Sequence, residues 1–406
     1  MNARTGAAGA RVRRVAVVCP DLTVIGGVRS VTSFVLQVLE ASGLYQPVLI
    51  SLATGSADRA SVQIRRPSTW RAGPQVRQET SGPLTYLHVG AQATEVEWMR
   101  YRPREPLMKL LEEVDLVHVI AGTPAWGLVA RDARVPVLLH AATLTEWERG
   151  PAQGSRAVAY WRTRMTKISA KLDREALAGA TGVLAQNRQL AGFAEAFAPG
   201  RTELLYPGTD TSRFRPPMEY ATDGHLLAVG RLGEPRKDWG TLFRAYAGAL
   251  QQQPDLPDLV VAGRGQLLAG DAALLHELGI VDRCRIEEDV DDARLLALYQ
   301  GASMYLLSSR EEGFGLVVVE AMASGVPVIA TRLDGTRETI VDGVTGLLVE
   351  RDEALVEAFR QALVGLWRDP ERRAVMRQDA LSAAQAFSTS HLSRQLLETY
   401  GRHLDD

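Results

Sequence analysis

The sequence predicts an α/β protein with two doubly wound domains, each built on a parallel sheet. Short apolar runs of strand type alternate with helical stretches along the chain, which is the order that produces parallel sheets. With 406 residues the chain is too long for one ordinary core, so two domains are the default. A proline-containing stretch, residues 207–220, separates the two alternating halves and is expected to act as a stiff hinge.

The predicted division of the chain has five parts. In chain order they are a flexible N-terminal tail (1–13), a first α/β domain (14–206), an interdomain linker (207–220), a second α/β domain (221–387) and a C-terminal helix that crosses back to the first domain (388–406).

The composition is that of an ordinary globular protein and argues against several other classes. The net charge is −2, so we expect no nucleic-acid partner. Cys19 and Cys284 are far apart in the sequence, so we expect neither a disulfide framework nor a metal cluster. No apolar run reaches the ~18 residues of a membrane span, and no signal-peptide pattern follows the basic N-terminus. We therefore expect a cytoplasmic protein.

The first domain opens with a strand and a glycine pair. Residues 15–20 form a continuous apolar run of buried-strand type. Gly26 and Gly27 then open a helix that Gly43 closes. Glycines after a first strand permit either a tight turn or a close approach of the backbone to a ligand, and the pair alone does not distinguish the two.

A second strand follows at residues 45–53, and the pattern then weakens. Residues 53–84 are polar and aperiodic, which predicts a long loop or an irregular insertion. The alternation resumes with a helix at 104–113 and strands at 115–120 and 135–141.

His140 stands near the end of the strand at 135–141. Open α/β sheets place their ligand crevice at the carboxyl ends of the strands, which makes His140 a candidate catalytic residue. The alternative is a structural histidine bonded to the backbone.

Residues 157–178 predict a helix with two stripes. Its apolar side chains recur at spacings of three and four, and a basic stripe runs beside them. Either the helix packs on its own domain with a solvated flank, or it contacts an anionic acceptor or a membrane surface.

The second domain opens with a strand that two basic residues follow. A strand ends at Gly230, and Arg231 and Lys237 follow before a helix. Farther on, the run before Ser308 predicts a buried strand, and residues 314–324 predict a helix that Gly325 ends. A strand, a glycine-rich turn and a helix N-terminus together favour anion binding, because free backbone N–H groups converge there.

Two carboxylates, Glu312 and Glu320, mark this turn and helix. If both were on the helix they would be roughly 12 Å apart, about the distance from a hexose to the ribose of a nucleotide sugar. Glu320 lies inside an apolar run, where an unpaired buried carboxylate would cost several kcal/mol. It therefore needs a partner: a ribose diol is one candidate, and a purely structural partner is the alternative.

The stretch EGFGLVVVEAMASGVPVIAT resembles the E-x7-E signature of retaining glycosyltransferases with the GT-B fold, most closely glycosyltransferase family 4. The resemblance covers most of the chain and is weakest between about residues 53 and 113. It implies two Rossmann-like domains facing across a cleft, and transfer of a sugar from a nucleoside-diphosphate sugar to an acceptor hydroxyl with retention at the anomeric carbon.

The resemblance also implies roles for individual residues. Arg231 and Lys237 would grip the donor diphosphate, Glu312 would orient the sugar and Glu320 the ribose, and His140 would stand near the sugar or acceptor. An ungapped count from Pro136 places the family's histidine at Ala142 instead, two positions along the same strand face. The remaining expected donor contacts are Gly26, Gly27, Val290, Gly313, Phe314, Gly315 and Leu316.

No metal and no other cofactor are expected, because protein groups would stabilise the leaving diphosphate. The Asp-x-Asp spacing in residues 289–292 falls in the region that would hold the nucleobase. The acceptor stays open among a glycan, a lipid-linked molecule and a small molecule, with weak peripheral contact to a membrane as a further possibility.

Two rival functions belong to other classes. One is a catalytically silent GT-B protein that binds a nucleotide sugar or another protein. The other is a dinucleotide-dependent Rossmann enzyme, against which the lack of a clean G-x-G-x-x-G after the first strand argues.

Overall fold

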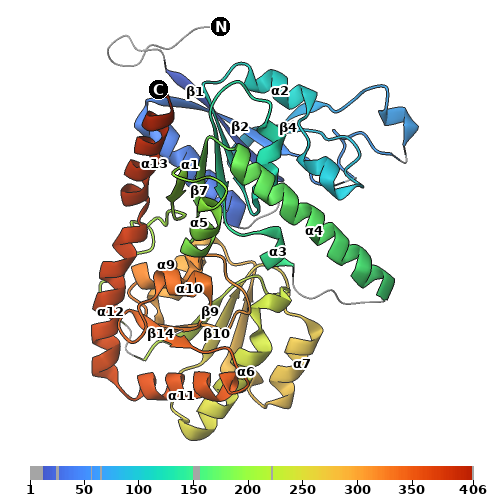
Figure 1. The fold of residues 1–406 in the computed structure, drawn as a ribbon. Helices are drawn as coiled ribbons and strands as arrows, with labels where there is room; N and C mark the ends of the chain where they lie inside the picture. Colours follow the sequence, from blue (N-terminus) through green and yellow to red (C-terminus); the bar gives the residue numbers. More distant parts are fainter. Residues whose placement is uncertain are drawn as a thin grey trace. The chain divides into compact units, whose positions relative to one another are not determined.

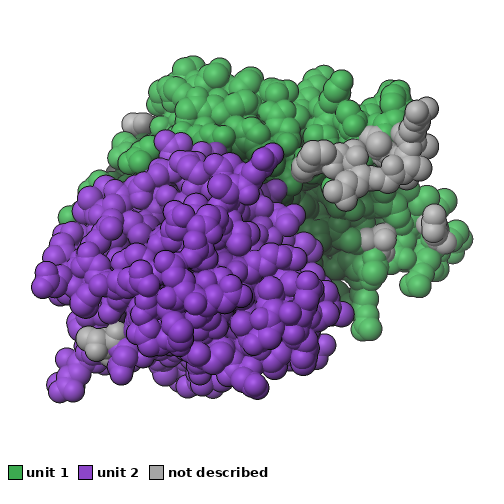
Figure 2. Space-filling model, turned by 90° about the horizontal axis from the view of Figure 1, so that it is seen from below, with its two compact units in different colours: residues 1–207, 393–406 green, residues 208–392 purple. Residues whose placement is uncertain are grey.

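The computed structural model describes residues 12–23, 27–55, 57–64, 66–149, 156–220 and 223–404, without the side chains of 156–159. The chain divides into two compact units, shown in different colours in Figure 2. Unit 1 comprises residues 1–207 and 393–406, and unit 2 comprises residues 208–392.

Unit 1 contains an eight-stranded sheet in the order β3-β4-β2-β1-β5-β6-β7-β8, counted over the described residues. All neighbours pair in parallel except β3 and β4, which are antiparallel. The strands are β1 (Arg13–Pro20), β2 (Tyr45–Leu52), β3 (Val76–Ser81), β4 (Leu84–Val89), β5 (Leu116–Ala121), β6 (Val137–Ala141), β7 (Gly182–Ala185) and β8 (Thr202–Leu204). The strand order reverses between β1 and β5.

Helices cover both faces of this sheet (Figure 1). They are α1 (Gly27–Ser42), η1 (Pro67–Thr69), η2 (Glu97–Tyr101), α2 (Glu105–Leu111), η3 (Pro124–Ala130), α3 (Thr145–Glu148), α4 (Arg156–Gly179), α5 (Arg188–Glu195) and α13 (Thr389–Leu404). One core joins the sheet to α2, η3, α4 and α5. On the other face Tyr400 of α13 packs edge-on against Tyr45 and His118.

Unit 2 contains a six-stranded, wholly parallel sheet in the order β11-β10-β9-β12-β13-β14 within the described residues. The strands are β9 (His225–Val229), β10 (Leu259–Gly263), β11 (Cys284–Glu288), β12 (Ala302–Leu307), β13 (Val328–Thr331) and β14 (Gly346–Val349). The order reverses between β9 and β12, as in dinucleotide-binding folds.

The helices of unit 2 also lie on both faces of its sheet. They are η4 (Pro235–Lys237), α6 (Trp239–Gln252), α7 (Ala269–Glu277), η5 (Val281–Arg283), α8 (Asp292–Gln300), α9 (Leu316–Ala323), α10 (Asp334–Thr339), α11 (Leu355–Trp367), α12 (Pro370–Ala384) and η6 (Gln385–Phe387). Alternate residues of β9 enter two separate cores: Leu226 packs with α6 and α11, whereas Leu227 packs with α8 and α9. Both sheets are therefore of the doubly wound type predicted.

One prediction for unit 1 needs correction. The stretch 53–84, expected as a loop or irregular insertion, contains β3 and the turn into β4. Gly82 makes that turn at φ +60°, a conformation that suits glycine. The side chains of β3 are mostly exposed at the edge of the sheet, so no apolar run announces the strand.

The predicted boundaries differ from the structure in three further places. Of the expected tail, residues 1–11 lie outside the described residues, and Arg13 already pairs in β1 with Tyr45. Residues 208–220, expected as a linker, group with unit 2, where Phe214 enters the core. Helix α9 begins at Leu316 rather than Phe314, because Gly315 before it has φ +84°.

Candidate functional site

The predicted charged residues of unit 2 gather where β9 and β12 end. These two strands are neighbours in the sheet, and the strand order reverses between them. Arg231 and Lys237 follow β9, while Glu312 follows β12. Ligands of open α/β sheets bind outside the carboxyl ends of the strands at such a reversal. The topology therefore brings together residues that are far apart in the sequence.

Lys237 and Glu312 form an ion pair at this point. Lys237 Nζ lies 3.0 Å from Glu312 Oε2, and the two side chains are 10% and 17% exposed. The stem of Lys237 lies against Gly230, where an added Cβ would come within 3.0 Å of Lys237 Cε. A larger residue at 230 would displace the lysine, so Gly230 is part of the geometry of the pair.

Hydrogen bonds between the two loops hold the lysine in place. Ser308 Oγ donates to the carbonyl oxygens of Lys237 and Asp238 at 3.0 and 3.1 Å. The backbone N–H of Arg310 donates to the carbonyl of Arg236 at 2.7 Å. The loop after β12 thus supports the loop after β9 at every residue from 236 to 238.

Asp238 is the strained residue of this arrangement. It has φ 54° and ψ 46°, a left-handed conformation that costs a non-glycine residue about 1–3 kcal/mol. Its carboxylate accepts hydrogen bonds from Arg310 at 3.0 Å and Arg351 at 2.8 Å. Burial raises the pKa of Asp238, but these two guanidinium groups outweigh burial and leave the pKa below its ordinary value. The charged carboxylate therefore anchors the loop that carries Lys237.

Arg231 is held by a carboxylate that sequence analysis did not select. Arg231 Nη2 lies 2.8 Å from Glu234 Oε2, and Arg236 contacts the other oxygen of the same carboxylate. The side chain of Arg231 is 47% exposed, so it can leave Glu234 for an incoming anion. Glu234 therefore pairs with two cations, Arg231 and Arg236, close in sequence to Lys237.

The glycine-rich turn after Glu312 positions the N-terminus of α9. Gly335 of α10 lies so close that an added Cβ would stand 2.2 Å from the carbonyl oxygen of Glu312. The N–H groups of Val318 and Val319 both bond to the carbonyl of Gly315. The N–H groups of Leu316 and Val317, in the first turn, have no acceptor within the helix.

Gly313 and Phe314 complete the turn in different ways. Phe314 is 5% exposed and packs edge-on against Phe387, with ring centroids 5.5 Å apart. Its ring anchors the turn and is not accessible to a ligand. An added Cβ at Gly313 would meet no atom within 4 Å, so this position is open.

Glu320 has a protein partner that the sequence did not reveal. The hydroxyl of Tyr299, on α8, donates to Glu320 Oε2 at 2.9 Å. Burial raises the pKa of Glu320 to about 7, and this hydrogen bond and Arg213 offset only part of the effect. The two carboxylates of the motif therefore differ: Glu312 is paired with a lysine, whereas Glu320 titrates near neutral pH.

The other expected contacts are distributed over both units. Val290 is half-buried beside the core of unit 2, after β11. Gly27 is the first residue of α1, and an added Cβ there would meet nothing within 4 Å. Gly26 lies outside the described residues.

His140 has no exposed surface. Its Nε2 bonds to the carbonyl of Leu205 at 3.3 Å, and its ring stacks on His118 at 5.4 Å between centroids. Burial lowers the pKa of His140 to about 4, so the ring is neutral. A side chain enclosed on all sides does not contact a sugar, and this geometry favours the structural alternative over the catalytic one.

Four supporting residues were not found from the sequence: Glu234, Asp238, Tyr299 and Arg310. Only Asp238 carried a local signal, since an aspartate directly before a helix is typical of an N-cap. That signal would have misled, because the side chain makes no cap hydrogen bond and binds two arginines instead.

Comparison with known proteins identifies the class. A family profile described as "Glycosyl transferases group 1" matches residues 223–369. The D-inositol 3-phosphate glycosyltransferase of Saccharomonospora viridis is 32% identical over 308 residues, 70% of this chain and 69% of that protein. D-inositol 3-phosphate glycosyltransferase 2 of Catenulispora acidiphila is 33% identical over 225 residues, 51% of this chain and 52% of that protein.

The chain belongs to the group 1 glycosyl transferase family. It spans about half the length of the first curated relatives that it matches. Among solved structures, sucrose-phosphate synthase from Thermosynechococcus elongatus aligns with a TM-score of 0.67 at 21% identity, over 96% of this chain and 98% of that one. The two-domain GT-B fold that the sequence predicted is thereby confirmed.

No helix among the described residues is both long and apolar enough to cross a membrane.

The raised pKa of Glu320 generates a prediction for stability. The pKa of Glu320 is about 7 in the folded protein, above its ordinary value of 4.5. The contribution of Glu320 to the free energy of unfolding is therefore fully present below pH 4.5 and is lost as the pH rises to 7. We expect Glu320→Gln to increase the free energy of unfolding at pH 8 by about 2 kcal/mol, allowing for partial exposure. The gain should vanish near pH 4.

Chemical denaturation between pH 4 and pH 8 measures this difference, with exposed Glu311→Gln as the matched control. A Glu320→Gln protein whose advantage over the wild type is the same at both pH values would contradict the assignment.

Proposed function

We propose that this protein is a retaining glycosyltransferase that moves a hexose from a nucleoside-diphosphate sugar to an acceptor hydroxyl. The observation that carries the proposal is the Lys237–Glu312 pair, 3.0 Å apart at the β9–β12 reversal and beside the N-terminus of α9. Cations and free N–H groups converge there, as a leaving diphosphate requires.

The proposed reaction breaks the bond between the anomeric carbon and the diphosphate oxygen. The negative charge that grows on that oxygen is stabilised by Lys237, by Arg231 once it leaves Glu234, and by the first N–H groups of α9. The acceptor oxygen attacks from the same side, and its proton passes to the departing phosphate oxygen. This route needs no protein nucleophile and retains the anomeric configuration.

The two carboxylates take separate parts of the donor. Glu312, oriented by Lys237, accepts hydrogen bonds from sugar hydroxyls. Glu320 accepts hydrogen bonds from the ribose, with the Tyr299 hydroxyl fixing one of its oxygens. Ribose hydroxyls would favour the ionised carboxylate, so donor binding should release a proton near neutral pH.

Unit 1 is proposed to take the acceptor. The start of α4 exposes Tyr160 and Trp161, which are 66% and 60% exposed, among the exposed cations Arg162 and Arg164. Contact with an anionic acceptor or with a membrane surface would use this end of the helix. Two relatives are named for D-inositol 3-phosphate, which makes phosphorylated polyols the first acceptors to try.

A screen of donors read by nucleoside-diphosphate release separates this proposal from its rivals. We expect release from one donor, faster with acceptor, and a product whose anomeric signal in NMR matches that of the donor. A catalytically silent GT-B protein would bind nucleotide and release nothing, and an inverted product would refute retention.

Lys237→Ala tests the phosphate assignment. Removing one charge stabiliser of the transition state should lower kcat/KM about 100-fold. Steady-state kinetics measure it, with Arg244→Ala on α6 as the control. Because the variant leaves Glu312 unpaired, Lys237→Ala/Glu312→Gln and thermal unfolding distinguish lost chemistry from lost stability. A kcat/KM within about threefold of the wild type, under 1 kcal/mol, would move the role to Arg236.

Transfer should continue in excess EDTA. The groups proposed to stabilise the diphosphate are Lys237, Arg231 and backbone N–H, so no divalent cation is required. Turnover after exhaustive chelation is the measurement. Activity that disappears with EDTA and returns with magnesium or manganese would show that a metal does this work.

A further inference from the structure

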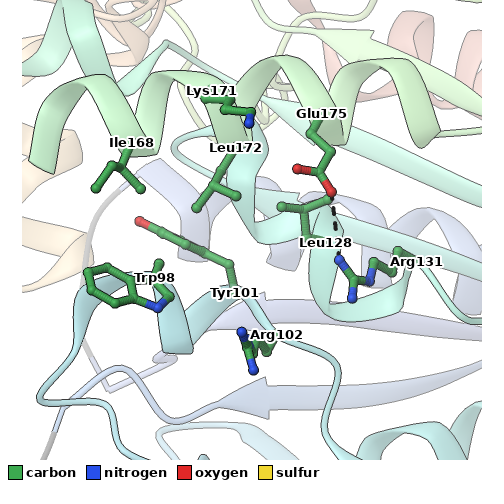
Figure 3. Close-up of a pocket in the computed structure, with 9 residues that line it drawn as sticks. All are labelled: Trp98, Tyr101, Arg102, Leu128, Arg131, Ile168, Lys171, Leu172 and Glu175. Atoms are coloured by element: carbon green, nitrogen blue, oxygen red, sulfur yellow. Dashed lines mark ion pairs between the residues drawn. The ribbon is translucent and has the colours of Figure 1, made fainter.

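A groove in unit 1 lies outside the site described above. It opens between η2, η3 and α4, with a volume of about 580 Å³, within the range of pockets that take one small ligand (Figure 3). Its lining comprises Trp98, Tyr101, Arg102, Leu128, Arg131, Ile168, Lys171, Leu172 and Glu175. None of the residues proposed for sugar transfer is among them.

The interior of the groove is apolar and aromatic. Leu128 and the ring of Tyr101 are buried, and Ile168 and Leu172 point down from α4 toward them (Figure 3). Trp98 is 36% exposed at one end. These side chains fit the hydrocarbon or aromatic body of a ligand, because removing apolar surface from water is favourable.

The hydroxyl of a largely buried tyrosine is aimed into this apolar space. Tyr101 is only 7% exposed, and its hydroxyl points toward Ile168 with no hydrogen-bond partner among the described residues (Figure 3). Burial, together with the carboxylates of Glu97 and Asp173, raises the pKa of Tyr101 to about 12. The hydroxyl therefore stays protonated and offers one unused donor inside the groove.

Two cations on the rim are uncompensated. Arg131 pairs with Glu175 across 3.6 Å. Lys171 and Arg102 are exposed, and within the described part of the chain neither side chain has an ion-pair or hydrogen-bond partner. The rim thus carries two net positive charges, one from α4 and one from the end of η2, which complement an anionic group.

The walls of the groove are fixed by buried hydrogen bonds. Asp173 of α4 accepts from the backbone N–H groups of Ala125 and Thr145 at 2.9 and 2.8 Å. On the other side, Ser169 donates to Glu97 of η2 at 2.9 Å. The helix is thereby attached to both neighbouring segments, so the groove exists before any ligand arrives.

From these observations we infer that the groove binds one dissolved anionic amphiphile, with its apolar body over Tyr101 and Leu172 and its acidic head at the rim, where Lys171 and Arg102 supply positive charge on opposite sides of the groove (Figure 3). The concave shape and the inward hydroxyl suit a single molecule, whereas a bilayer would need a projecting surface. Binding here does not depend on the sugar transfer proposed above and can be measured without activity.

Dodecyl phosphate below its micelle concentration is the probe, titrated calorimetrically into the full-length protein. Inorganic phosphate tests the head alone, and dodecyl maltoside tests the body without charge. We expect one site, affinity reduced at least about tenfold in Lys171→Glu/Arg102→Glu, and no change in Lys167→Glu, an exposed lysine of the same helix outside the groove. Because Trp98 lines the groove, binding of dodecyl phosphate should also change tryptophan fluorescence. Trp98→Phe should remove that change.

Three results would overturn the inference. They are equal binding of dodecyl phosphate by Lys171→Glu/Arg102→Glu and Lys167→Glu, equal affinity for dodecyl maltoside, and binding of inorganic phosphate as tight as that of dodecyl phosphate. Vesicles containing phosphatidic acid are tested separately. If the wild type binds these vesicles but not dissolved dodecyl phosphate, and Lys171→Glu/Arg102→Glu loses the vesicle binding, the rim contacts a membrane instead. Tyr101→Phe, which keeps the ring, should weaken the probe severalfold while leaving thermal unfolding unchanged.

Discussion

The ion pair between Lys237 and Glu312 is the interaction on which the candidate site of unit 2 depends. Two largely buried charges are stable only when their remaining hydrogen-bonding capacity is met and their geometry is fixed. Here the fixing comes from Ser308 and from Asp238, whose strained backbone is held by two arginines. The parallel sheet supplies the rest, because it places the ends of β9 and β12 side by side.

The same motif holds two carboxylates in different electrostatic states. Glu312 faces a lysine, whereas Glu320 faces a tyrosine hydroxyl and has a pKa of about 7. In the proposed donor complex, the sugar would face the charge-paired Glu312 and the ribose would face Glu320, which changes protonation near neutral pH. This difference arises from the neighbours on α8 and on the loop after β9, and the eight-residue spacing does not determine it.

The fold was predictable because buried parallel strands are continuous apolar runs, as in β5 and β12. The hairpin of β3 and β4 was not predictable, because the exposed edge strand β3 has no such run.

In the site, the positions of Arg231, Lys237 and Glu312 after strand ends followed from sequence. The residues that support them did not, because the contacts span long stretches of chain: Arg351 reaches Asp238 across 113 positions. For His140 the sequence predicted the place near a strand end but not the direction of the side chain. Its ring turns into the protein interior beside Leu205.

The most direct test is a crystal structure of the protein with a bound nucleoside diphosphate, obtained with both uridine and guanosine forms. The account predicts diphosphate oxygens within hydrogen-bond distance of Lys237 Nζ and of the first N–H groups of α9, Arg231 moved away from Glu234, and the ribose hydroxyls on Glu320. A diphosphate bound elsewhere, with the Lys237–Glu312 pair and the Tyr299–Glu320 hydrogen bond undisturbed, would contradict it.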